Sequence, residues 1–157
     1  MSKKIEQYKL MNAQLEALID DVPHLISNMA NASALLYQTL EDINWAGFYL
    51  MQEDILVLGP FQGKTACIEI AVGKGVCGTA VERREIMLVK DVHEFPGHIA
   101  CDSASNSEIV LPIYRGNEVF GVLDIDSPSI ARFDEEDKMG LQEFVQIFEK
   151  SLCNLTI

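Results

Sequence analysis

The two ends of the chain show the hydrophobic spacing of amphipathic helices. Apolar positions three or four residues apart predict a helix over about residues 6–20, resting on Tyr8, Met11, Leu15, Leu18 and Ile19. Pro23 follows and is well placed to open a second helix, over about residues 23–40. At the other end, Asp134 and Asp137 occupy capping-box positions. The apolar stripe of the helix they begin is Leu141, Phe144, Val145, Phe148 and Leu152.

Between these helices the pattern changes to short runs rich in β-branched and aromatic residues, which is typical of strands. The runs cover residues 45–51, 55–59, 67–72, 86–89, 109–114 and 119–126. Residues 52–54 and 115–118 are short enough to close two hairpins. A glycine-rich loop and a short helix precede the fourth run, and a long irregular segment, 91–107, follows it. Irregular segments of this length are often functional.

This order of elements predicts an α+β fold. Strands joined by hairpins indicate an antiparallel sheet, and the N- and C-terminal helices would pack on one of its faces. With no repeat or linker in the sequence, residues 1–157 form a single domain in this interpretation.

Composition narrows the function classes. Apolar residues make up 48% of the chain, enough for a sizeable core. The net charge of −12 disfavours binding to nucleic acid or to an anionic membrane surface. No apolar run approaches a membrane span, and the charged N-terminus lacks the apolar region of a secretory signal. We therefore expect a cytoplasmic protein.

The cysteines give the first indication of chemistry. In a reducing compartment, thiols are free, catalytic or metal-bound rather than structural disulfides. Cys67, Cys77 and Cys101 lie close together in the sequence, whereas Cys153 falls in the last helix and is interpreted as packing. Cys101 stands in a polar loop, an unusual place for a buried structural thiol. Thiol redox chemistry, with a sulfenic acid resolved by a second cysteine, and inert buried thiols are both consistent with this pattern.

Two other sites are weaker interpretations. His93, His98 and Cys101 could supply zinc ligands from one loop, but their spacing is loose and no metal is expected. Residues 73–78 match the G-x-G-x-x-G pattern of a dinucleotide site. That site requires a parallel sheet of βαβ units, so a glycine turn without a cofactor is favoured.

Two aspartates on one predicted strand give the second indication. Asp124 and Asp126 are two residues apart and therefore point to one face, which we also expect to carry Phe120 and Val122. A three-residue turn between the last two strands would place Glu108 directly opposite Asp124. Three neighbouring carboxylates suit an ammonium group or a metal ion, and a solvated acidic face is the alternative.

Trp45 and Tyr49 lie on one face of the first predicted strand. They could form the aromatic wall of a small-molecule pocket or a plain core stripe.

Taken together, several segments resemble the free methionine-(R)-sulfoxide reductases, which are single-domain GAF-fold enzymes. The matching segments are residues 44–50, 59–64, 73–78, 95–102, 107–110 and 121–128. The resemblance extends from about Asn12 to the last helix and includes the positions of Cys67, Cys77 and Cys101.

The resemblance implies reduction of free L-methionine (R)-sulfoxide to methionine. By motif, Cys101 would be the nucleophile, and Cys67 would resolve its sulfenic acid, with Cys77 as an alternative. The reductant would be thioredoxin, no cofactor would be needed, and the protein would be a homodimer.

The same resemblance implies where the substrate binds. Two of Glu108, Asp124 and Asp126 would hold its ammonium group, and the third would hydrogen-bond the sulfoxide oxygen. Trp45 and Tyr49 would surround the S-methyl group. Backbone N–H groups of Ile99, Ala100 and Cys101 would bind its carboxylate. The competing interpretation is a GAF-type ligand-sensing or redox-sensing module without turnover.

Overall fold

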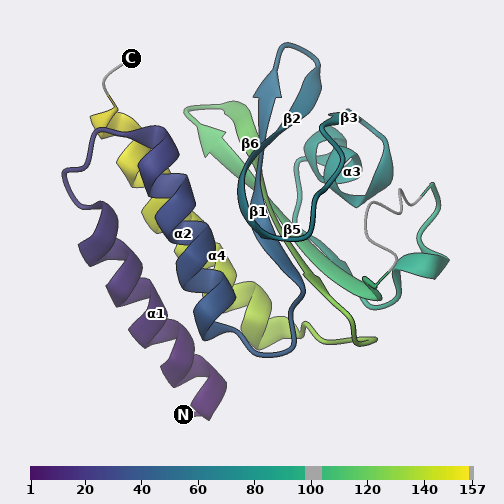
Figure 1. Ribbon diagram of the computed structural model, residues 1–157, viewed down its shortest axis with the longest axis horizontal. Coiled ribbons are helices and arrows are strands. Elements are labelled where there is room, and N and C mark those ends of the chain that lie inside the picture. Colours follow the sequence, from purple (N-terminus) through teal and green to yellow (C-terminus); the bar gives the residue numbers. More distant parts are fainter. Residues whose placement is uncertain (98–103, 156–157) are drawn as a thin grey trace.

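The computed structural model describes residues 1–97 and 104–155, and its elements form three layers (Figure 1). One face of the central sheet is covered by the long helices α2 (Leu25–Thr39) and α4 (Glu135–Ser151), and α1 (Lys3–Ile19) packs on the outside of these two. The short helix α3 (Gly75–Arg83) lies against the other face. None of the helices in these two described ranges is long and apolar enough to cross a membrane.

The sheet has six strands in the order β3-β2-β1-β6-β5-β4, and every neighbouring pair is antiparallel. The strands are β1 (Trp45–Gln52), β2 (Ile55–Gly63), β3 (Glu69–Ala71), β4 (Met87–Val89), β5 (Ser107–Arg115) and β6 (Glu118–Ser127). Because β3 and β4 are at opposite edges, the chain between them crosses a whole face of the sheet and places α3 over its centre. The predicted α+β architecture is confirmed.

Alternation along the strands divides the apolar side chains between two cores. The larger core joins the sheet to α1, α2 and α4, and includes Phe48, Leu123 and Ile125. The smaller core lies beneath α3 and includes Trp45 and Tyr49. Both aromatic residues therefore share a face of β1, as predicted.

A buried carboxylate ties the first helix to the last. Asp137 is buried and accepts hydrogen bonds from Tyr8 Oη at 2.7 Å, Lys4 Nζ at 3.0 Å and Arg132 Nη1 at 3.3 Å. It also completes a capping box with Asp134, which confirms the predicted start of α4. The backbone N–H of Arg132 donates to Ser107 Oγ at 3.3 Å, so this cluster also reaches the start of β5.

Several element boundaries differ from the predictions. The second helix begins at Leu25, so Pro23 precedes it instead of opening it. β2 continues to Gly63, because pairing with β1 resumes at Phe61 after an irregularity. β3 covers only Glu69–Ala71, so Cys67, which was predicted to begin this strand, lies in the connection before it.

The predicted register of the last hairpin is wrong by two residues. The hairpin turn contains two residues, not three, and Arg115 pairs with Glu118. A further irregularity opposite Ile113 and Tyr114 leaves Phe120 without a partner in the ladder and turns its side chain toward the larger core. Phe120 therefore does not share a face with Val122, contrary to the prediction. Glu108 lies opposite Asp126 rather than Asp124. Because the register differs from the prediction by an even number of residues, all three carboxylates still lie on the same face of the sheet.

Candidate active site

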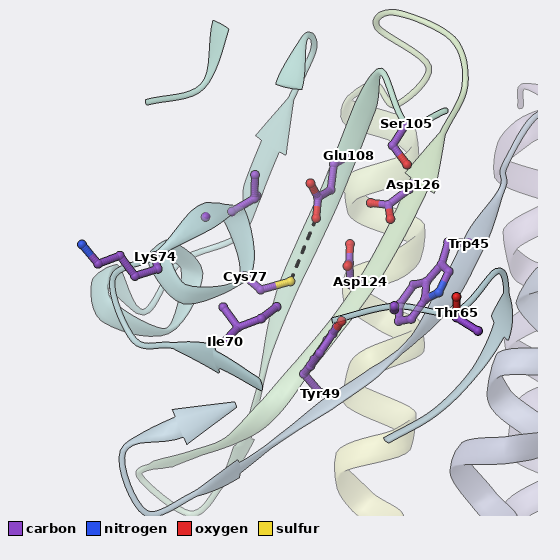
Figure 2. Close-up of a pocket in the computed structure, with 13 residues that line it drawn as sticks. Trp45, Tyr49, Thr65, Ile70, Lys74, Cys77, Ser105, Glu108, Asp124 and Asp126 are labelled. Carbon is purple, nitrogen blue, oxygen red and sulfur yellow. Dashed lines mark hydrogen bonds between the residues drawn. The ribbon is translucent and has the colours of Figure 1, made fainter. Parts of the chain in front are cut away.

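A pocket opens between α3 and the face of the sheet that carries the carboxylates (Figure 2). Its lining combines two aromatic rings, three carboxylates, one thiol and the first residues of α3. The lining residues are Trp45, Tyr49, Thr65, Ala66, Ile70, Lys74, Gly75, Val76, Cys77, Ser105, Glu108, Asp124 and Asp126. Seven of the ten predicted site residues fall in the described ranges, and all of these except Cys67 line the pocket.

The carboxylates are held in two adjacent rows across the sheet. In one row Trp45, Asp126 and Glu108 are successive partners on β1, β6 and β5. In the next row Asp124 stands beside Gly47 of β1, where a side-chain Cβ would overlap Phe61. Phe61 therefore fills the place that a side chain at position 47 would take. The cluster is thus fixed by strand pairing rather than by a flexible loop.

Burial makes this cluster costly to ionise. Glu108 is 7% exposed and Asp124 is 6% exposed. Burial raises the pKa of Glu108 above its ordinary value. The pKa of Asp124 is raised well above its ordinary value, first by burial and then by the negative charges of Asp126 and Glu108. The pocket can therefore both hold a proton on one carboxyl group and attract a cation that relieves the repulsion.

Cys77 is part of this cluster. It lies in the first turn of α3, is 3% exposed, and donates from Sγ to Glu108 Oε2 at 4.0 Å. Burial raises the pKa of its thiol well above the ordinary value, and the charges of Asp124 and Glu108 raise it further. A thiol in these surroundings is a poor source of thiolate. Cys77 is therefore better suited to act as a hydrogen-bond donor than as an attacking nucleophile.

The two aromatic residues form one wall of the pocket and also hold the segment that carries Cys67. Their rings stack, with centroids 5.9 Å apart. Trp45 Nε1 donates to the carbonyl of Lys64 at 3.1 Å, and Tyr49 Oη donates to the carbonyl of Cys67 at 2.9 Å. Both interpretations of these residues are therefore correct, because the two rings belong to the buried core and also line the pocket.

The state of the cysteines differs from position to position. Cys67 is half-buried and engaged in a disulfide bond. Cys77 and Cys153 are free thiols, the first buried and the second exposed. Cys101 and the backbone donors predicted at Ile99 and Ala100 lie outside the described residues.

Seven lining residues were not among the predicted site residues: Thr65, Ala66, Ile70, Lys74, Gly75, Val76 and Ser105. Lys74 reaches the pocket edge, but its ammonium group points away from the carboxylates (Figure 2). Ser105 is buried and accepts a hydrogen bond from Asn44 Nδ2 at 3.1 Å. Its position in a serine-rich stretch beside Glu108 was the signal that could have identified it.

The glycine-rich segment has a structural explanation. Gly73 adopts a positive φ of 85°, and a Cβ at Gly78 would overlap the carbonyl oxygen of Ala71. These glycines let α3 begin directly against β3. The antiparallel sheet differs from the parallel βαβ arrangement that a dinucleotide site uses.

Among the described residues, metal-ligating groups come together in the pocket. Ligand atoms of Cys77, Glu108 and Asp124 all lie within 4.8 Å of one another. His93, by contrast, is exposed and hydrogen-bonds Asn106 Oδ1 at 3.0 Å, and its predicted co-ligands His98 and Cys101 fall outside the described residues.

Comparisons with known proteins agree on one family. A profile of the GAF domain matches residues 27–149. The free methionine-R-sulfoxide reductase of Escherichia coli is 56% identical over 150 residues, which cover 96% of this chain and 91% of that protein. The chain belongs to the free methionine-R-sulfoxide reductase family of GAF-domain proteins.

Solved structures of this family have the same fold over nearly the whole chain. The Staphylococcus aureus fRMsr in complex with substrate is 52% identical, with a TM-score of 0.89 and coverage of 92% of this chain and 95% of that one. The Neisseria meningitidis free methionine-R-sulfoxide reductase in complex with its substrate is 41% identical, with a TM-score of 0.94 and coverage of 98% and 93%. The predicted resemblance is confirmed.

Proposed function

We propose that this protein reduces free L-methionine (R)-sulfoxide to L-methionine. The observation that carries the proposal is the buried cluster of Glu108, Asp124 and Asp126 beside an aromatic wall. Family membership supports the same reaction, since relatives named for this activity match almost the entire chain.

The carboxylates account for selection of the free amino acid. The ammonium group of a free amino acid carries a full positive charge, and a partly dehydrated site with several carboxylates strengthens its attraction. A methionine sulfoxide within a peptide has a neutral amide in that place. Burying that amide would leave the charge of the ionised carboxylates in the cluster uncompensated, so the peptide substrate is rejected.

One carboxyl group of the cluster supplies the acid. A sulfoxide is a weak electrophile until its oxygen is protonated or strongly hydrogen-bonded, so a proton donor is needed beside the attacking thiolate. Glu108 and Asp124 have raised pKa values because both are buried, and Asp124 also faces neighbouring negative charges. Such crowding keeps one of them protonated near neutral pH.

The thiol steps are assigned to Cys101 and Cys67. Cys101 takes the sulfoxide oxygen: the S–O bond of the substrate breaks, methionine leaves reduced, and Cys101 becomes a sulfenic acid. The thiol of Cys67 then attacks that sulfur, the hydroxyl leaves as water, and a disulfide forms. A disulfide at Cys67 in this structure supports its role as resolving thiol. Thioredoxin, a dithiol, restores both thiols by exchange.

Cys77 is assigned a supporting role. Its thiol is buried and donates to Glu108, and its raised pKa disfavours the thiolate needed for attack. We therefore assign Cys67 as the resolving thiol and keep Cys77 as the alternative.

The proposal is tested by a thioredoxin-coupled assay that follows NADPH oxidation. Free (R)-methionine sulfoxide, the free (S) epimer and N-acetylated (R)-methionine sulfoxide are supplied separately. We expect turnover with the free (R) substrate alone. Equal turnover of the N-acetylated substrate would refute the ammonium argument, and absence of turnover with all three in folded, reduced protein would favour a ligand-sensing GAF module.

Single-turnover experiments separate the cysteines. Cys101→Ser should form no methionine, whereas Cys67→Ser should form one methionine per chain and then fail to recycle with thioredoxin. One methionine per chain from Cys101→Ser would show that another thiol attacks first.

We also propose that the protein is a cytoplasmic homodimer. Large apolar side chains exposed on α1 and α2 support the dimer: Leu10, Leu18, Ile26 and Tyr37. Light scattering coupled to gel filtration gives the molar mass, and a monomer at micromolar concentration would contradict the assignment.

A further inference from the structure

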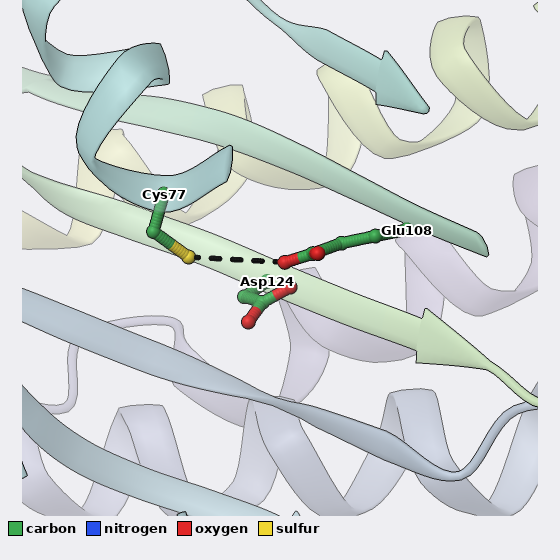
Figure 3. Close-up of side chains that lie close together, drawn as sticks. All are labelled: Cys77, Glu108 and Asp124. Atoms are coloured by element: carbon green, nitrogen blue, oxygen red, sulfur yellow. Dashed lines mark hydrogen bonds between the residues drawn. The ribbon is translucent and has the colours of Figure 1, made fainter. Parts of the chain in front are cut away.

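Three potential metal ligands from different elements converge in the pocket (Figure 3). Cys77 comes from α3, Glu108 from β5 and Asp124 from β6. One ligand atom of each lies within 4.8 Å of the other two, and all three residues are buried. Strand pairing holds the carboxylates and helix packing holds the thiol, so their convergence does not depend on a loop.

A second observation at the same place points to a missing partner. Asp124 Oδ1 is buried and has no hydrogen-bond partner in the described part of the chain. Buried carboxylate oxygens are normally satisfied by a donor or a cation, because leaving one without a partner is costly. Asp124 lines the pocket, so a cation can approach its carboxylate from that side.

We propose that Cys77, Glu108 and Asp124 bind a thiophilic divalent cation, with zinc as the physiological ion, and that this ion inhibits the enzyme by occupying the pocket. The inhibitory part rests on the proposed function, because the zinc ion would stand where the ammonium group of the substrate is expected. The binding part does not depend on it.

The ligand set selects the class of metal. A thiolate with two carboxylates suits zinc, whereas magnesium and calcium require more oxygen ligands and avoid sulfur. In a tetrahedral zinc site with a Zn–S bond of about 2.3 Å and a Zn–O bond of about 2.0 Å, sulfur and oxygen stand about 3.5 Å apart. Cys77 Sγ and Glu108 Oε2 are 4.0 Å apart, so a small side-chain rotation closes the difference.

The binding step balances without any redox change. The Cys77 thiol and the protonated carboxyl group of the Glu108–Asp124 pair each lose a proton to solvent as zinc binds, and the two carboxylates then bind through one oxygen each. The fourth position faces the pocket and takes a water molecule. Bound zinc also occupies the free lone pair of Asp124 and removes the acid that the reaction requires. Inhibition should therefore be reversed by a chelator.

Cobalt(II) is the probe, since it replaces zinc and reports sulfur ligation by a sulfur-to-cobalt charge-transfer band. The host is Cys153→Ser, which removes the exposed thiol. It is used in the oxidised form, in which Cys67 is in a disulfide and Cys77 is free. We expect one cobalt per chain with a tetrahedral visible spectrum and a charge-transfer band. A spectrum without sulfur ligation would overturn the proposal.

Two variants locate the ion. Cys77→Ser should abolish the charge-transfer band, and Asp124→Asn should weaken cobalt binding at least about tenfold while leaving the sulfur ligand in place. Circular dichroism verifies that each variant is folded. A band that persists in Cys77→Ser would place the ion elsewhere and would contradict the assignment.

Competition separates this proposal from the proposed function. Free L-methionine should raise the apparent dissociation constant of cobalt in proportion to its concentration, and zinc should raise KM for the sulfoxide without changing kcat. Reductase activity with no cobalt binding would refute the metal site alone. Cobalt binding at Cys77 that methionine does not affect would retain the metal site and refute the shared pocket.

Discussion

Replacing Asp137 with asparagine should destabilise the protein far more than the same change at Asp134. Both carboxylates bind the same ammonium group: Lys4 Nζ lies 2.9 Å from Asp134 Oδ2 and 3.0 Å from Asp137 Oδ2. The side chain of Asp134 is 57% exposed and that of Asp137 is 1% exposed. Asp137 also pairs with Arg132, whose side chain is 14% exposed. The comparison therefore contrasts a buried carboxylate, which also binds Arg132 and Tyr8, with an exposed one that shares only Lys4.

The size of the loss in stability follows from the partners of Asp137, which are left without its negative charge. Removing one member of a buried ion pair costs about 3–5 kcal/mol, and the lower end applies because Lys4 keeps Asp134. For a chain of 157 residues, each kcal/mol lowers Tm by about 2–4 °C, so Asp137→Asn should lose about 6–12 °C. Asp134→Asn removes an exposed charge worth at most about 1 kcal/mol, and asparagine also caps helices well.

Calorimetry on both variants and the wild type gives Tm and unfolding enthalpy, and urea titration gives the free energy of unfolding. Circular dichroism establishes that each variant is folded before melting. Equal losses for the two variants would refute the reasoning, because they would show that pairing with Lys4, and not the buried contacts with Arg132 and Tyr8, determines the contribution of Asp137.

Three further predictions concern the site and the helix packing. Asp124→Asn should abolish reductase activity, yet the variant should have a higher Tm than wild type at neutral pH. The pKa of Asp124 is raised in the folded protein, so folded Asp124 keeps a proton that the unfolded chain loses above a pKa of 3.8. The stability of the wild type therefore falls as pH rises. The difference in Tm should vanish below about pH 4, and a constant difference would contradict this. Tyr49→Phe removes the hydrogen bond to Cys67 O, so we expect a loss of about 1–2 kcal/mol in urea titrations and slower thioredoxin recycling with single-turnover yield unchanged. Gly140→Ala should cost about 1–3 kcal/mol because its Cβ would overlap the Tyr8 ring, and an unchanged Tm would show that α1 can shift away.

The fold could be predicted because periodicity reports which face of each element is buried. Helix α1 and helix α4 were found from their apolar stripes, and the three carboxylates were placed on one face by counting alternate residues. The exact register was not predictable, because it depends on the length of the turn at Gly116 and on the irregularity at Phe120. The pattern of hydrophobic and polar residues reports neither the turn length nor this irregularity.

The chemistry of the pocket was only partly predictable. Sequence identified Cys77 as one thiol among several, but its burial and its contact with Glu108 come from the way α3 crosses the sheet between distant edge strands. Likewise the hydrogen bonds from Trp45 and Tyr49 to the segment near Cys67 join parts of the chain whose contact no local pattern encodes.

The position of Trp45 gives the protein an intrinsic optical reporter. It is the single tryptophan of the chain, and its indole lines the pocket while stacked against Tyr49 and Phe61. Tryptophan emission therefore originates beside Asp126, its neighbour across the strands, and nowhere else in the molecule. A bound amino acid or metal ion that alters this surrounding changes the fluorescence, so occupancy can be followed in real time without a label.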